Sequence, residues 1–118
     1  MNSQNKQIQG CIIWKPPAQP KEDILKIVRR RLSGKVIAAY LFGSVARNEH
    51  SSDSDLDLVI VAETDLPFIK RSELFDDLLD ELPRSDLLVY TQKEFETLTK
   101  DPSPGFWSSI VSEMQRVI

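Results

Sequence analysis

Three apolar runs in the middle of the chain predict β-strands. Residues 36–42 and 56–62 are rich in β-branched and aromatic side chains, as buried strands are, and residues 85–91 repeat this composition. Between the first two runs lies a Gly43-Ser44 corner, followed by a polar stretch over residues 48–54 that is typical of a loop. We therefore expect two neighbouring strands joined across this corner and loop.

Apolar residues at helical spacing predict helices before, between and after these strands. Residues 20–32 have one apolar face, with Gly34 placed to end the helix, and residues 67–82 show a second such face. A capping box over residues 91–94 begins another helix. A last helix is predicted from apolar residues recurring over 106–117, which are assigned to the core.

Composition describes one soluble domain. The 118 residues are 41% hydrophobic and 28% charged, and the net charge of −3 argues against a duplex nucleic-acid substrate. The single cysteine, Cys11, allows no internal disulfide, and no apolar run reaches the roughly 20 residues of a membrane span. We expect a cytoplasmic protein with an N-terminal extension and linker over residues 1–20, including a short strand at 10–14, and a domain over residues 21–118.

Two aspartates begin the second predicted strand. Asp55 and Asp57 point to the same side of a strand, about 7 Å apart, because strand side chains alternate. Their mutual repulsion is roughly 2–3 kcal/mol at an effective dielectric constant near 20. A bound divalent cation turns this repulsion into attraction, and carboxylate oxygens are the ligands that Mg²⁺ prefers. The alternative is a solvated strand entrance that binds nothing.

The Gly43-Ser44 corner is a candidate phosphate site. A tight glycine turn leaving a buried strand offers backbone N–H groups and a small hydroxyl to an anion. Arg47 follows closely enough to reach the same anion. The corner and the acid pair, separated by ten residues and flanked by strands, form a specific combination.

This combination, Gly43-Ser44, ten residues, then Asp55-x-Asp57, with Ala46-Arg47 inside it, resembles the signature of the polymerase-β-type nucleotidyltransferase superfamily. It is most similar to the minimal nucleotidyltransferase branch, whose small proteins are often encoded beside HEPN-domain toxins. The resemblance implies an α/β (α+β) fold with a small mixed sheet and helices mainly on one face. It also implies an ATP donor held with two Mg²⁺ ions, and transfer of AMP to a hydroxyl.

The resemblance assigns roles to individual residues. It makes Asp86, which opens the third predicted strand, the third carboxylate beside Asp55 and Asp57, binding metal and accepting the proton of the attacking hydroxyl. Gly43, Ser44 and Arg47 would bind the terminal phosphates while pyrophosphate leaves. The family usually places glycine after Ala46-Arg47; here Asn48 stands there, which tolerates a left-handed backbone.

Three functions stay open. The first is an antitoxin that adenylylates a HEPN-type protein partner. The second is a nucleotidyltransferase for a small molecule such as an antibiotic, and the third is a binding subunit with a vestigial nucleotide site that blocks its partner sterically. A homo-oligomer is left open. Trp107 is weighed as a nucleotide contact against plain packing, and His50 as a phosphate or partner contact against an exposed loop residue.

Overall fold

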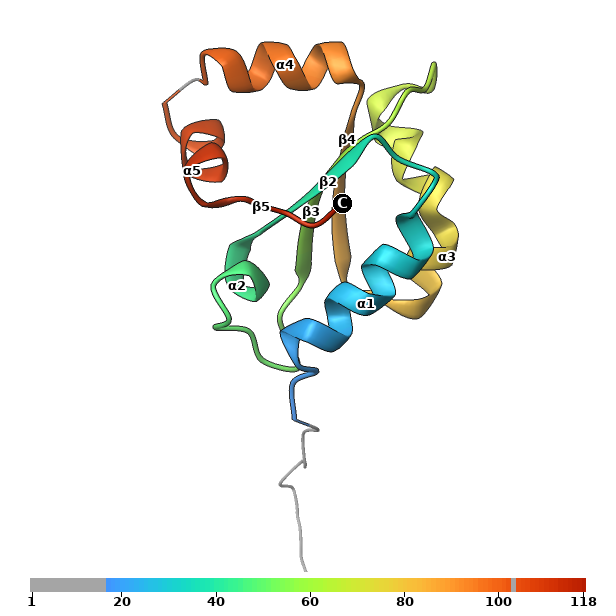
Figure 1. Ribbon diagram of the computed structural model, residues 1–118, viewed down its shortest axis with the longest axis vertical. Coiled ribbons are helices and arrows are strands. Elements are labelled where there is room, and N and C mark those ends of the chain that lie inside the picture. The colour runs from blue at the N-terminus through green and yellow to red at the C-terminus, as the bar shows by residue number, and fades with distance from the viewer. Residues whose placement is uncertain (1–16, 103) are drawn as a thin grey trace, which may run out of the picture.

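The computed structural model describes residues 17–102 and 104–118, and a four-stranded mixed sheet lies at its centre (Figure 1). The strand order is β4-β3-β2-β5. β3 is antiparallel to β2 and parallel to β4, and β2 is also antiparallel to β5. The strands are β2 (Ala38–Phe42), β3 (Leu56–Val61), β4 (Ser85–Tyr90) and β5 (Gln115–Arg116). The strand expected at residues 10–14 lies outside the described residues.

Helices cover both faces of this sheet. In Figure 1, α1 and α3 lie on one side, whereas α4 and α5 lie on the other. The fold class is confirmed as mixed α/β, but the helices are not gathered mainly on one face. The helical segments are α1 (Lys21–Leu32), α2 (Gly43–Ala46), the 3-10 helix η1 (Phe68–Phe75), α3 (Asp76–Glu81), α4 (Gln92–Lys100) and α5 (Phe106–Glu113).

The alternation of side chains along β3 divides the core into two layers. Leu58 and Ile60 face α1 and α3, where they pack with Val28 and Leu78. Val59 and Val61 face the opposite way and belong to a second apolar cluster that includes residues of α4 and α5. Because β3 side chains alternate, Asp57 shares the face of Val59. The aspartate therefore lies on the α4 and α5 side.

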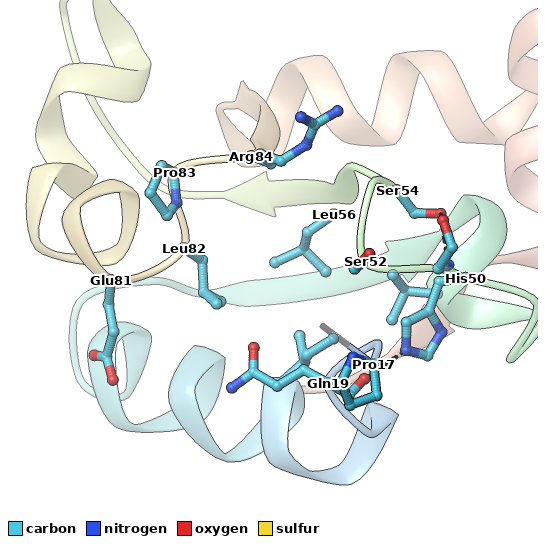
Figure 2. Close-up of a pocket in the computed structure, with 13 residues that line it drawn as sticks. Pro17, Gln19, His50, Ser52, Ser54, Leu56, Glu81, Leu82, Pro83 and Arg84 are labelled. Carbon is cyan, nitrogen blue, oxygen red and sulfur yellow. Dashed lines mark hydrogen bonds between the residues drawn. The ribbon is translucent and has the colours of Figure 1, made fainter. Parts of the chain in front are cut away.

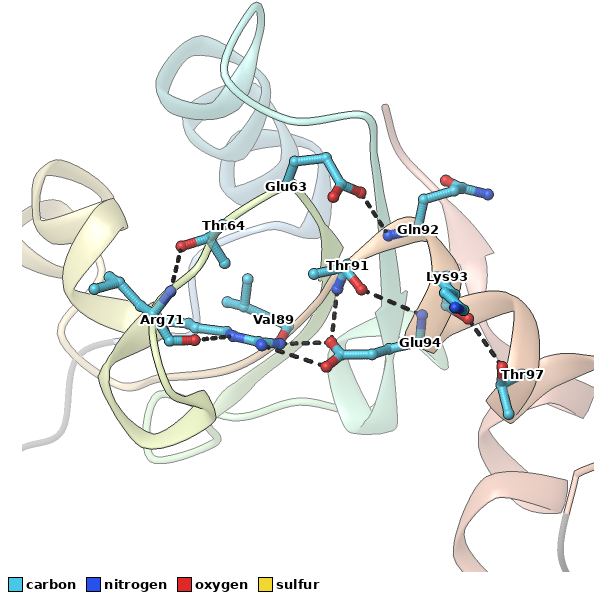
Figure 3. Close-up of polar contacts among 10 residues, drawn as sticks. Glu63, Thr64, Arg71, Val89, Thr91, Gln92, Lys93, Glu94 and Thr97 are labelled. Atoms are coloured by element: carbon cyan, nitrogen blue, oxygen red, sulfur yellow. Dashed lines mark hydrogen bonds and ion pairs between the residues drawn. The ribbon is translucent and has the colours of Figure 1, made fainter.

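The expectation of a single helix over residues 67–82 is wrong. The segment instead forms η1 followed by α3, with Phe75 in a non-helical conformation between them (φ −122°, ψ 38°). Arg71 explains the difference, because its buried guanidinium donates to the carbonyls of Leu66 and Val89 and pairs with Glu94 (Figure 3). These tertiary contacts tie η1 to β4 and α4 and outweigh the helical apolar pattern.

The expected last helix is right at its start and wrong at its end. α5 ends at Glu113, Met114 is extended, and β5 then pairs with β2. The N–H of Val117 donates to the carbonyl of Ala39 (2.8 Å), so pairing with the exposed edge of β2 replaces the last helical turn. Phe106, expected in the core, is 59% exposed.

The predicted signals at the helix ends agree with the structure. Gly34 adopts a positive φ of 79° after α1, and the Thr91–Glu94 capping box is present in both directions. Among the described residues, no helix has both the length and the apolar character needed to cross a membrane.

Candidate functional site

The candidate site lies at the end of the sheet where β2 stops and β3 and β4 begin. Phe42 is opposite Asp57 across the β2–β3 pair, and Asp57 is opposite Asp86 across the β3–β4 pair. Neighbouring strands are about 4.8 Å apart, so side chains paired in this way lie next to one another. Asp55 precedes β3 by one residue and shares the side of Asp57. The strand register therefore places the three acids near one another at this end of the sheet, as expected. Their catalytic role stays a prediction.

Gly43 lies directly against the central carboxylate. A Cβ atom at this position would lie 2.3 Å from Oδ2 of Asp57, and the glycine has a φ of 77°. Because of this short distance and the positive φ, a residue with a side chain could replace Gly43 only if the surrounding structure rearranged. The Gly-Ser corner and the acid pair are thus in contact.

Electrostatics set Asp57 apart from an ordinary surface acid. Burial, followed by the nearby carboxylates of Asp86 and Asp55, raises its pKa, and the guanidinium of Arg47 opposes this rise. A divalent cation would relieve the repulsion, and the oxygen donors suit Mg²⁺. Within residues 17–102 and 104–118, however, no three acidic, histidine or cysteine side chains are arranged as a ready metal site. The donor set fits such an ion, but the side chains would need to converge on it.

Ser44 and Arg47 occupy α2 and its C-terminus. Ser44 is half-buried, whereas Arg47 is exposed. The guanidinium of Arg47 lies 3.0 Å from Glu49 Oε1 through Nε and 3.0 Å from Glu113 Oε1 through Nη1. Asn48 follows with a φ of 58°, the left-handed conformation expected for it. The turn that the family usually builds with glycine is therefore kept.

Two further charged residues touch this site, and the sequence did not single them out. Arg84 Nη2 lies 3.4 Å from Asp55 Oδ1 and donates to the carbonyl of Asp53. Its place two residues before Asp86, directly ahead of a strand expected beside Asp55, was a usable signal. Glu113 comes from α5, and no pattern marked it.

A separate pocket of about 310 Å³ lies near the N-terminus of α1 (Figure 2). Leu56, which belongs to the core layer under α1, lines it together with His50 and Arg84. Nε2 of His50 is 2.6 Å from the carbonyl of Gln19, and Nδ1 has no partner within the described part of the chain. The pocket therefore opens beside the acids and not around them, and it does not replace them as the candidate site.

The aromatic side chains of α5 pack against each other and against rings of β2 and β4. Phe106 packs edge-on against Phe42 with ring centres 6.5 Å apart, and against Trp107 at 5.9 Å. Trp107 in turn meets Tyr90 at 5.3 Å. Trp107 is thus engaged in packing, whereas Phe106 leaves most of its ring exposed.

Comparison with known proteins identifies the family. The model of the nucleotidyltransferase domain family matches residues 21–117. No curated protein matches the chain. Similar solved structures include a nucleotidyltransferase candidate from Sulfolobus solfataricus, 19% identical over 66% of this chain and 76% of its own, with a TM-score of 0.51.

Two further solved structures are of toxin–antitoxin proteins. A toxin–antitoxin with AMP-PNP is 24% identical, covers 85% of this chain and 73% of its own, and has a TM-score of 0.53. A mutant of the toxin–antitoxin MntA-HpeT is 22% identical with the same coverages and a TM-score of 0.50. At these identities the likeness extends to the fold. By the family match over nearly its whole described length, the chain belongs to the nucleotidyltransferase domain family.

Proposed function

We propose that the protein transfers AMP from ATP to a hydroxyl group of a protein partner, and that it acts as the antitoxin of a toxin–antitoxin pair. The observation that carries the chemistry is the contact between Gly43 and Asp57, with Asp86 paired beside them. This arrangement puts an N–H-rich corner, suited to phosphate, against the carboxylates. The toxin–antitoxin with AMP-PNP shares the fold, which supports both a nucleotide and a protein partner.

In this proposal, hydrogen-bond donors bind the phosphates and carboxylates bind the metal. The N–H of Gly43, the hydroxyl of Ser44 and the guanidinium of Arg47 would bind and orient the terminal phosphates of the nucleotide. Asp55, Asp57 and Asp86 would hold Mg²⁺, two ions in the full proposal, which supplies neutralisation of the charge on the phosphates. Asp86 lies at the start of an edge strand and is exposed, so an acceptor hydroxyl can approach it. Its carboxylate would accept the proton as the hydroxyl attacks the α-phosphorus and pyrophosphate leaves.

The test is incubation with Mg²⁺, a co-purified partner protein and ATP radiolabelled on its α-phosphate. Label should appear on the partner, and Asp57→Asn should abolish it. Glu96→Gln on α4 is the matched control, because it removes an exposed charge away from the site and should leave labelling unchanged. Label on a small molecule would favour the antibiotic-type function. Partner binding without label that persists in Asp57→Asn would favour a steric inhibitor.

A further inference from the structure

One carboxylate already occupies two of the three donors that the proposed function assigns to phosphate, the N–H of Gly43 and the guanidinium of Arg47. Oε1 of Glu113 lies 3.0 Å from Nη1 of Arg47, and it accepts a longer hydrogen bond of 3.4 Å from the N–H of Gly43. Glu113 is the last residue of α5, 70 positions along the chain from Gly43. A distant helix thus supplies an anion to this corner.

We infer that Glu113 is an internal competitor for the phosphate-binding corner, so that nucleotide can bind there only by displacing it. The inference rests on the proposed function, since it assigns a resident ligand to the same donors. It makes α5 the element that responds when the nucleotide arrives.

The charge balance at the corner supports competition. Arg47 is shared by two carboxylates, Glu49 on Nε and Glu113 on Nη1, so one cation faces two anions. A phosphate group approaching this arrangement meets net negative charge, to which Asp57 adds. Removal of Glu113 leaves Arg47 free on its Nη1 side and frees the N–H of Gly43 at the same time. The freed guanidinium and N–H can then make charge-assisted hydrogen bonds to a phosphate, so the exchange changes the affinity for nucleotide.

The contact is also built to open. The side chain of Glu113 is 38% exposed and that of Arg47 is 47% exposed, so water can replace either partner as they separate. Exposed ion pairs contribute little to stability, so separating Glu113 from Arg47 requires little free energy. α5 ends at Glu113, and the following Met114 is extended. The carboxylate can therefore swing away without unwinding the middle of the helix.

The experiment measures binding of inorganic pyrophosphate and of ATP, each with Mg²⁺, by calorimetry. Glu113→Ala should bind both roughly three- to thirty-fold more tightly than the unmodified protein, the range for an exposed to charge-assisted contact. Glu113→Gln keeps the side-chain length and disturbs the fold less, and its affinities should lie between those of Glu113→Ala and of the unmodified protein. Glu96→Gln controls for the change in net charge and should bind like the unmodified protein. Hydrogen exchange over residues 110–114, at the C-terminal end of α5, should rise in the unmodified protein when pyrophosphate is added, because Glu113 then leaves the corner.

The outcomes separate this inference from the proposed function. Equal or weaker binding by Glu113→Ala and Glu113→Gln, or no change in exchange at the C-terminal end of α5, would overturn the inference, even if AMP transfer is observed. Tighter binding by both variants without any AMP transfer would support the inference while refuting the proposed function. Absence of pyrophosphate and ATP binding in every variant would refute both.

Discussion

Glu94→Gln tests how α4 is fixed to the rest of the fold. Arg71 is 8% exposed, and its guanidinium makes a two-point contact with Glu94, at 2.6 Å to Oε1 and 3.3 Å to Oε2 (Figure 3). Glutamine keeps the capping contact with the N–H of Thr91 but removes the charge. The variant therefore leaves a buried cation with only carbonyl partners while preserving the start of α4.

The pKa of Glu94 gives the size of the effect. The hydrogen bond from Arg71, followed by that from the backbone of Thr91, lowers this pKa to about 2. Relative to an ordinary glutamate, this corresponds to about 3 kcal/mol in favour of the charged form in the folded protein. Because the side chain is 44% exposed and the Thr91 contact survives in the variant, we discount the loss to roughly 1–2 kcal/mol. The expected fall in Tm is roughly 4–10 °C.

The pH dependence follows from the sign of the shift. The pKa of Glu94 is lower in the folded state than in the unfolded state, so its contribution is complete above about pH 4.5 and is lost as the pH falls toward about 2. Urea unfolding at neutral pH should therefore show the full difference between the unmodified protein and Glu94→Gln. At about pH 3 that difference should be roughly halved.

Glu96→Gln is the control for this series. It removes the same charge from an exposed position on the same helix, where Glu96 accepts a hydrogen bond from Gln92 at 2.8 Å. Its stability should stay within about 0.5 kcal/mol of the unmodified protein. The reasoning is refuted if Glu94→Gln unfolds at the same urea concentration as Glu96→Gln, or if its deficit is as large at pH 3 as at neutral pH.

Three further predictions concern the site and the core. Gly43→Ala should lose AMP transfer, and its free energy of unfolding should fall by about 2 kcal/mol. Gly34→Ala, whose added Cβ meets nothing within 4 Å, should lose only about 1 kcal/mol through backbone strain. Activity assays and thermal unfolding of both variants test this comparison. Asp57→Asn should abolish transfer yet raise stability, since it removes a partly buried charge that is repelled by Asp86. A lower urea midpoint than that of the unmodified protein would contradict this. Leu78→Ala should cost roughly 2–4 kcal/mol in urea unfolding because Leu78 is 1% exposed in the main core, and a loss below 1 kcal/mol would argue against that packing.

The central strands and the shared side of Asp55 and Asp57 could be predicted because both depend on local sequence. The β-branched runs specify β2, β3 and β4, and alternation puts Asp55 and Asp57 on one side before any long-range contact is known. The pairing of Asp86 with Asp57 was expected through the family resemblance, and the parallel register places it there. The positive φ of Asn48 also agrees with the residue's own tolerance for that conformation.

The features that sequence reasoning missed depend on contacts between distant residues. An arginine inside an apolar pattern was taken as part of a helix, and nothing nearby in sequence indicates that Arg71 is buried against Val89 and Glu94. β5 forms because the edge of β2 is available to Gln115 and Arg116, which cannot be seen from their own composition. Glu113 contacts Gly43 across 70 positions of the chain, next to the point where β5 pairs with β2, so its contact with the site has no local signature.

The most direct test of the candidate site is the location of a bound divalent cation. Mn²⁺ in place of Mg²⁺, added at low concentration with ATP, broadens the NMR signals of nearby backbone amides. We expect selective broadening at Gly43, Asp57 and Asp86, lost in Asp57→Asn. Broadening that instead centres on the exposed acids Asp76, Asp77 and Asp80, or that persists unchanged in Asp57→Asn, would contradict the site.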